Sequence, residues 1–129
     1  MTDRAALLMD LAERYEQASG PDRELDARIY ILTTGGSAAD ADYAATDPDV
    51  TCKPLRYTAS LDAALTLVPE GWAWAVYGGA REEIVATAYC VPNGGRLPWP
   101  DWVTDICAAT PALALCAAAL RALASGAPR

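Results

Sequence analysis

The longest stretch of the chain without a charged residue runs from Ile106 to Leu120. Thr110 and Pro111 interrupt this stretch, and it is shorter than the roughly 20 apolar residues that a membrane-spanning helix needs. Thr110 is a typical N-cap residue and Pro111 suits the first helical position, so the pattern predicts a helix that ends at Ser125 and Gly126. The predicted inner stripe of this helix consists of Leu113, Cys116, Ala117 and Leu120. The opposite, Ala-rich side is narrow, so we expect it to pack closely against another element of a soluble protein.

The size and charge of the chain limit its fold and its partners. Its 129 residues suffice for one domain, which we expect to span residues 1–129. Hydrophobic residues make up 53% and charged residues 21%, which is a globular composition. The net charge of −7 argues against DNA or RNA as a partner and against docking on an anionic membrane. Residues 1–10 carry no signal-peptide pattern, so we expect a cytoplasmic protein.

The absence of histidine excludes several kinds of active site. Without it the chain cannot form a Ser-His-Asp triad, a Cys-His pair or a His-containing zinc site. We therefore expect no enzymatic activity, no catalytic residue, no metal site and no cofactor. The four cysteines, which lack Cys-x-x-Cys spacing, are interpreted as buried free thiols, with a disulfide framework or a four-Cys metal site as alternatives: Cys52, Cys90, Cys107 and Cys116.

Hydrophobic periodicity and turn residues divide the chain into helices and strands. The patterns predict helices over 4–18, 21–32 and 57–68, the last of them capped by Thr58 or Ser60, and strands over 72–76 and 82–91. Residues 35–55 show no clean period and are interpreted as a long irregular loop, either functional or an exposed excursion. The four aspartates of this loop do not have calcium-loop spacing, so we interpret them as solvated: Asp40, Asp42, Asp47 and Asp49. The predicted fold is a single α/β (α+β) domain with a small antiparallel sheet sandwiched by helices.

Aromatic and basic residues provide the candidate ligand-binding site. Arg56, Tyr57 and Ser60 lie at the predicted start of the 57–68 helix, where free backbone amides and the helix dipole favour an anion. Residues 96–102 form an aromatic, Pro-rich segment that contains Arg96, Trp99 and Trp102. Guanidinium groups pair with phosphates and aromatic rings stack on bases, so these two groups of residues together suit a nucleotide. The alternative interpretation assigns the same aromatic residues to the core, to a rim or to a subunit interface.

Three segments of the chain are similar to the phage "ABA sandwich" family. They are residues 57–72, which read YTASLDAALTLVPEGW, the closing helix over 109–122, and the opening helix together with residues 20–26. The resemblance implies a small phage or prophage protein with α/β/α layering. The shared motifs consist of caps and turns, so the resemblance transfers no catalytic residue to this chain.

The resemblance leads to one functional expectation and two alternatives. Some small phage proteins bind nucleotide immune signals and hold them away from host effectors. We therefore expect an anti-defence sponge, a homo-oligomer that binds a cyclic oligonucleotide or an ADP-ribose-like ligand. One alternative is a protein–protein adaptor that inhibits a host factor or assists phage assembly. The other is a His-free, metal-dependent hydrolase that uses Glu82 or Glu83.

Overall fold

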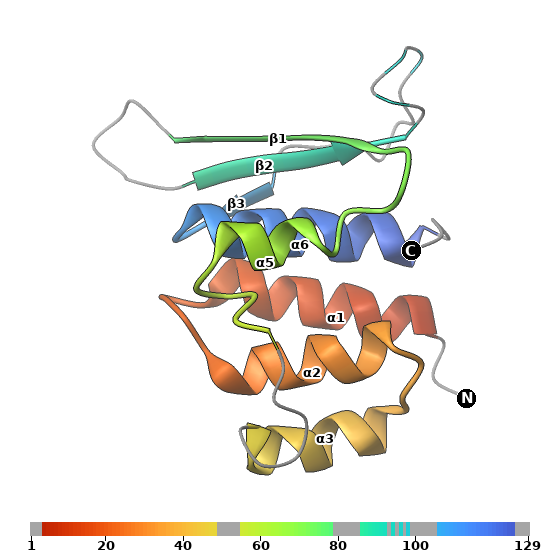
Figure 1. Cartoon of the computed structure of the whole chain (residues 1–129), viewed down its shortest axis with the longest axis vertical. Helices are drawn as coiled ribbons and strands as arrows, with labels where there is room; N and C mark the ends of the chain where they lie inside the picture. The colour runs from red at the N-terminus through yellow and green to blue at the C-terminus, as the bar shows by residue number, and fades with distance from the viewer. Residues whose placement is uncertain are drawn as a thin grey trace.

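The computed structural model describes residues 4–48, 55–78, 86–92, 94, 96, 98 and 106–125. Within these residues the chain forms five helices and a three-stranded antiparallel sheet, which confirms the predicted α+β class (Figure 1). The elements in chain order are α1 (Arg4–Gln17), α2 (Arg23–Thr33), α3 (Ala38–Thr46), α5 (Leu61–Leu65), β1 (Ala73–Gly78), β2 (Ala86–Val91), β3 (Ile106–Ala108) and α6 (Pro111–Ala124). No helix in this part of the chain has the length and apolarity needed to cross a membrane.

The sheet has β2 in its centre, with β1 and β3 paired antiparallel on either side of it. Ala73 pairs with Val91 at one end of the β1–β2 ladder, and Gly78 pairs with Ala86 at the other. Side chains alternate between the two faces of a strand, so small buried residues from β2 share the face that packs on α6. These residues are Ala86, Ala88 and Cys90.

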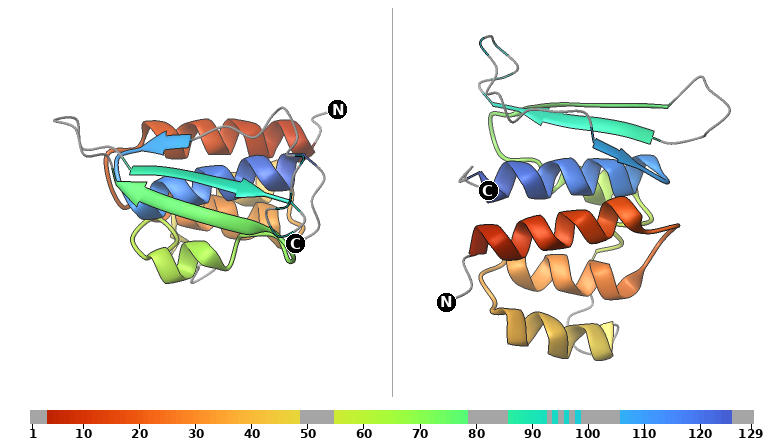
Figure 2. Two further views of the ribbon diagram at one scale, coloured as in Figure 1. Left: turned by 90° about the horizontal axis from the view of Figure 1, so that it is seen from above. Right: turned by 180° about the vertical axis from the view of Figure 1, so that it is seen from behind.

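Helix α6 is the most deeply buried element among the described residues. Ten of its residues are buried, and they point in every direction around the helix axis. The sheet lies on one side of α6 and α1 lies on the other, while α5 packs beside it (Figures 1 and 2). A helix that is apolar all round is stable only when other elements cover it, and its alanines let those elements approach closely. The predicted close packing of the Ala-rich side is therefore confirmed.

The layering differs from the α/β/α order that the resemblance implies. All five described helices lie on the same side of the sheet, so within the described residues the sheet is an outer layer (Figure 2). The layers then follow in the order sheet, α6, α1, α2 and α3 (Figure 1). The element covered on both sides is α6, because its residues up to Leu120 are uncharged and offer no polar face to water.

The prediction of an irregular loop over residues 35–55 is wrong for its central part. Residues 38–46 form α3, which begins at a capping box. Ser37 Oγ accepts the Asp40 N–H at 3.1 Å, and the Asp40 carboxylate accepts the Ser37 N–H at 3.2 Å. Asp42 pairs with Arg28 of α2. The sequence did not predict this helix, because paired glycines before Ser37 indicate a turn and its apolar stripe consists of only three alanines.

The described bounds of three other predicted elements differ from those expected. The helix predicted over residues 57–68 is helical only over α5, because residues 57–59 form a turn that precedes the cap. The strand predicted over residues 82–91 is described as β2 from Ala86 onward, and its first four residues lie outside the described ranges. The predicted first strand starts one residue later than expected and extends to Gly78.

Candidate functional site

The turn at residues 56–60 is the part of the predicted site that the structure defines best. The backbone N–H groups of Ala59 and Ser60 both donate to the Arg56 carbonyl oxygen, at 3.1 and 2.9 Å. Ser60 then caps α5, since its Oγ accepts the Ala63 N–H at 3.3 Å. Of the two predicted caps, Ser60 is thereby confirmed. Arg56 is exposed at the start of this turn.

A buried aspartate of α2 holds the turn in place. The Asp26 carboxylate is fully buried and accepts the backbone N–H of Thr58 at 2.8 Å. It also accepts a guanidinium N–H from Arg23 at 3.1 Å. Burial raises the pKa of Asp26 above its ordinary value, although both hydrogen bonds oppose this shift. The position of the turn therefore depends on one carboxylate whose desolvation is partly offset by two hydrogen bonds.

The Thr58 side chain adds a second connection between the turn and α2. Its hydroxyl oxygen accepts the Asp22 N–H at 2.8 Å, and the hydroxyl donates to the Asp22 carbonyl oxygen at 3.2 Å. Asp22 is itself the N-cap of α2, because its carboxylate accepts the N–H groups of Glu24 and Leu25. The start of α2 and the 56–60 turn are thus joined through Thr58. Its hydroxyl bonds to the backbone of Asp22, and its backbone N–H bonds to the carboxylate of Asp26.

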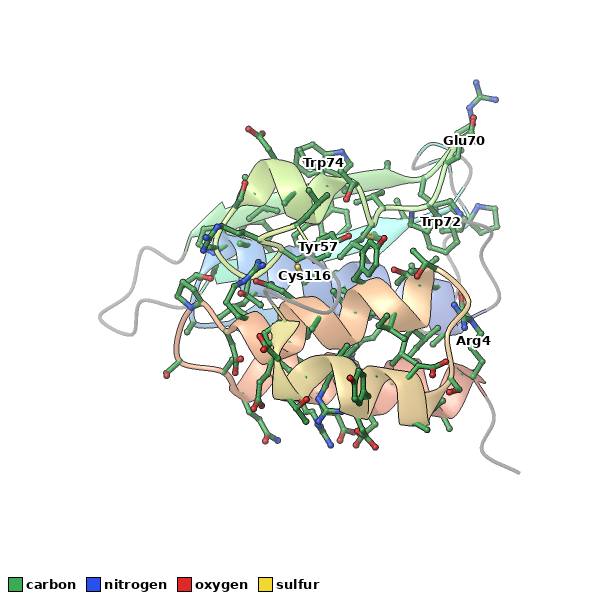
Figure 3. All side chains as sticks on the ribbon, turned by 60° about the horizontal axis from the view of Figure 1, so that its bottom comes forward. Arg4, Tyr57, Glu70, Trp72, Trp74 and Cys116 are labelled. Carbon is green, nitrogen blue, oxygen red and sulfur yellow. The ribbon has the colours of Figure 1, made fainter. Side chains whose placement is uncertain are left out.

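Tyr57 points into the protein and belongs to the core. Its side chain is 2% exposed, and its carbonyl oxygen accepts a hydrogen bond from the Cys116 thiol at 3.3 Å (Figure 3). Tyr15 lies in the same core, where its hydroxyl donates to the Leu25 carbonyl oxygen at 3.0 Å. Desolvation raises the pKa values of Tyr15 and Cys116 well above their ordinary values. The Tyr57 ring has no accessible face, so the predicted stacking of a ligand on it would require the ring to leave the core.

A pocket of about 290 Å³ opens beside this turn, at the N-terminal end of α6. Seven residues from three parts of the chain line it: Pro21, Thr58, Ala59, Leu61, Thr110, Pro111 and Ala112. The Thr110 hydroxyl oxygen caps α6 by accepting the Leu113 N–H at 3.2 Å. The Ala112 N–H belongs to the first turn of the helix and has no intrahelical acceptor. The walls are mainly apolar and carry no charged side chain, which suits the flat, uncharged part of a small molecule.

The remaining predicted site residues lie elsewhere or outside the described residues. Arg96 is exposed and follows Gly94, whose N–H donates to the Gly71 carbonyl oxygen at 2.8 Å. Gly71 precedes the start of β1, whereas the pocket lies near β3 and α6, at the opposite end of the sheet (Figure 1). The structure therefore separates Arg96 from Arg56 and Ser60. Trp99 and Trp102 are outside the described residues.

A second hollow, of about 210 Å³, lies among α1, α2 and α3. It contains the guanidinium groups of Arg14 and Arg28 beside the carboxylates of Asp10 and Asp42. Arg14 lies 3.5 Å from Asp10, and Arg28 forms an ion pair with Asp42. Because each guanidinium already has a carboxylate partner, this hollow offers less to an incoming anion than its two arginines suggest.

Sequence reasoning missed the central role of Asp26 and the participation of the α6 N-terminus in a pocket. A signal for Asp26 was present, because this acid falls on the apolar side of α2 beside Leu25 and Ile29. A charged residue on a buried stripe indicates that a specific hydrogen-bond or ion-pair partner lies inside the protein. The partner, Thr58, lies 32 residues away in sequence, and no local pattern connects the two.

Comparison with known proteins identifies no family for this chain, and the described residues offer no cluster of metal ligands. No protein-family model, no curated protein and no solved structure matches the chain. The resemblance to the phage family therefore stays a prediction. Across the residues that the structure describes, no three Cys, Asp or Glu side chains gather in a way that could hold a metal ion. Glu82, Glu83 and Asp49 lie outside those residues.

The cysteines are free where the structure describes them. Cys90 and Cys116 are buried, as predicted, whereas Cys107 on β3 is exposed. Burial raises the pKa of Cys90 to about 12, so its thiol stays protonated and unreactive. The exposure of Cys107 corrects the expectation of buried thiols, and it arises because β3 alternates buried, exposed and buried residues. Cys52 lies outside the described residues.

Proposed function

We propose that the protein is a non-enzymatic binder of a small nucleotide-type ligand, and that it acts by sequestering this ligand. The observation that carries the proposal is the pocket between the 56–60 turn and the start of α6. Its apolar walls suit a base or another planar group, and the Thr110 hydroxyl and the Ala112 N–H supply polar contacts. The resemblance to phage proteins supports an immune signal as the ligand and anti-defence as the purpose.

The distribution of charge favours a particular orientation of the ligand. The pocket wall has no charged side chain. Arg56 is exposed and lies two residues before Thr58, which forms part of the wall together with Ala59. A phosphate is therefore better placed at the rim, near Arg56, than in the pocket interior. The first-turn amide of Ala112 and the positive end of the α6 dipole lie on the other side of the pocket and favour the same anion.

The size of the pocket supports a homo-oligomer. Its volume of about 290 Å³ is at the lower end of the range of about 300–1,000 Å³ for small-molecule sites. One pocket of this size takes one base with its sugar, so a cyclic oligonucleotide needs pockets from more than one chain. An ADP-ribose-like ligand would place its second half outside the pocket, against a neighbouring chain.

The proposal is tested by thermal-shift measurements with cyclic di- and trinucleotides and with ADP-ribose. A ligand at 100 times its dissociation constant stabilises the native state by about 2.7 kcal/mol. We expect one class of ligand to raise Tm and to be recovered intact after denaturation. Ala59→Trp, which fills the pocket, and Arg56→Gln should reduce the shift, whereas Arg14→Gln on α1 should leave it unchanged.

The other outcomes assign a different function. Recovery of a cleaved ligand would overturn the sequestering role and support the metal-dependent hydrolase. The absence of a shift with every ligand would contradict nucleotide binding and support the protein–protein adaptor. A shift that all three variants leave unchanged would place the ligand away from this pocket.

A further inference from the structure

The hollow among α1, α2 and α3 is lined by both charged and apolar side chains. Its volume of about 210 Å³ is below the range of about 300–1,000 Å³ for drug-sized ligands, so it suits a molecule smaller than a nucleotide. Four of its lining residues are charged, two of each sign: Asp10, Arg14, Arg28 and Asp42. The positive and negative charges of the lining therefore cancel.

The directions of the helices determine which lining residues lie together. Arg4, at the start of α1, donates to the Leu32 carbonyl oxygen of α2. Tyr15, near the end of α1, donates to the carbonyl oxygen of Leu25. α1 and α2 therefore run antiparallel, and Leu7, which follows Arg4 by about one turn, lies toward the Leu32 end of α2 (Figure 1).

α3 repeats this separation of apolar and charged residues. Arg28 of α2 pairs with Asp42 of α3. Leu32 lies about one helical turn after Arg28. Ala38 lies about one turn before Asp42, and because α3 returns antiparallel along α2, both apolar residues lie at the same end (Figure 1). The hollow thus has an apolar end, formed by Leu7, Leu32 and Ala38, and a charged end.

The charged end holds two ion pairs that leave hydrogen-bonding groups free. The Asp10–Arg14 pair of α1 follows Leu7 in sequence, so it lies away from the apolar end. Arg14 approaches its partner through Nε at 3.5 Å, and Arg28 donates to Asp42 through Nη1. Within the described part of the chain, the other N–H groups of both guanidinium groups have no acceptor. Each carboxylate also keeps lone pairs that can accept further hydrogen bonds.

This arrangement favours a ligand that carries both charges. A lone anion would be attracted by the two guanidinium groups and repelled by the two carboxylates, and a lone cation would meet the reverse. A zwitterion is attracted by all four groups at once. The apolar end gives a place to an apolar body attached to the two charged groups.

We propose that this hollow binds a free α-amino acid with an apolar side chain. The carboxylate of the ligand accepts N–H groups of Arg14 and Arg28. Its ammonium group donates to the carboxylates of Asp10 and Asp42, and its side chain extends toward the apolar end. This site is separate from the pocket at the start of α6, and it does not rest on the proposed binding of a nucleotide.

The ligand exchanges partners with ion pairs that contribute little to stability. The side chain of Asp10 is 64% exposed and that of Asp42 is 71% exposed, and ion pairs that lie largely in water are weak. Rearranging them around the ligand therefore costs little. The same contact with water limits the gain from the new ion pairs, so we expect a dissociation constant in the millimolar range.

An NMR titration of the full chain with L-leucine, without any nucleotide, tests the site. We expect the largest amide shift changes at Leu32 and Ala38. Three matched ligands each lack one feature: 4-methylpentanoate lacks the ammonium group, 3-methylbutylamine lacks the carboxylate, and glycine lacks the apolar side chain. Each should bind at least about tenfold more weakly than leucine, because each loses one set of contacts.

Substitutions at the charged end test its role without disturbing the core. Arg14 and Asp10 are more than half exposed, so Arg14→Gln and Asp10→Asn should leave the fold intact. Each should weaken leucine binding about fivefold. The matched variants Arg96→Gln and Glu13→Gln, at exposed positions outside the hollow, should leave leucine binding unchanged.

Three results would overturn the proposal. The first is equal binding of leucine, 4-methylpentanoate and 3-methylbutylamine, because the apolar end alone would then account for it. The second is the absence of shift changes with leucine at concentrations well above the millimolar range. The third is leucine binding that Arg14→Gln and Asp10→Asn both leave unchanged. None of these results bears on nucleotide binding at the α6 pocket, and failure of nucleotide binding would not affect this site.

Discussion

Replacing Asp26 with alanine tests whether one buried carboxylate holds the candidate site together. The substitution leaves the Thr58 N–H without its acceptor at a residue that is only 1% exposed. An unsatisfied buried donor costs about 1–3 kcal/mol. Arg23 also loses an ion-pair partner, while the desolvation cost of the carboxylate is recovered. We expect a net loss of about 2 kcal/mol in the free energy of unfolding.

Chemical denaturation and calorimetry measure this loss directly. For a chain of this length, 1 kcal/mol corresponds to about 3–5 °C, so Tm should fall by about 6–10 °C. Asp42→Ala is the matched control, because Asp42 also pairs with an arginine but its side chain is 71% exposed. That control should cost less than about 1 kcal/mol. Equal losses in the two variants would refute the conclusion that burial and the Thr58 hydrogen bond make Asp26 important.

The same residue predicts a dependence of stability on pH. The pKa of Asp26 is raised by burial above its ordinary value of 3.8, so the folded chain binds this proton more readily than the unfolded chain. In the window between the two pKa values, the contribution of Asp26 to stability grows as the pH falls and is lost as the pH rises. The free energy of unfolding of the wild type, relative to Asp26→Asn, should therefore increase as the pH falls through this window. An opposite slope would contradict the raised pKa.

Three further predictions concern the core, a helix cap and the thiols. Leu115→Ala in α6 should lower the free energy of unfolding by about 2–5 kcal/mol in chemical denaturation, because Leu115 is fully buried. Ser37→Ala should cost about 1 kcal/mol and increase amide hydrogen exchange within α3, whereas unchanged exchange there would contradict the capping box. In the native protein Cys107 should react with an alkylating reagent while Cys90 and Cys116 should not, as mass spectrometry of peptides would show.

The class of the fold could be predicted from the sequence because its strongest signals are local. Thr110 was assigned to a helix start and Ser60 was one of two candidate caps, and the structure confirms both positions. Alternating residues predicted the two longer strands. α3 was missed because its stripe of alanines carries little hydrophobic contrast, and the preceding glycines indicated a turn.

The arrangement of the site could not be predicted, because it depends on contacts between residues distant in sequence. Asp26 meets Thr58, and Thr58 lines a pocket with Thr110, although 52 residues separate these two threonines. Tyr57 was predicted to contact a ligand. The local sequence could not correct this prediction, because a tyrosine beside a helix start is equally compatible with a core or a surface position. Only its burial and its hydrogen bond with Cys116 identify it as a core residue.

The most direct test of the account is amide chemical-shift mapping by NMR during titration with the ligand that gives the largest thermal shift. We predict that the largest changes occur at Ala59, Leu61 and Ala112, which line the pocket from two separate parts of the chain. Changes confined to the hollow among α1, α2 and α3, or to β1, would contradict the assignment of the site to the start of α6.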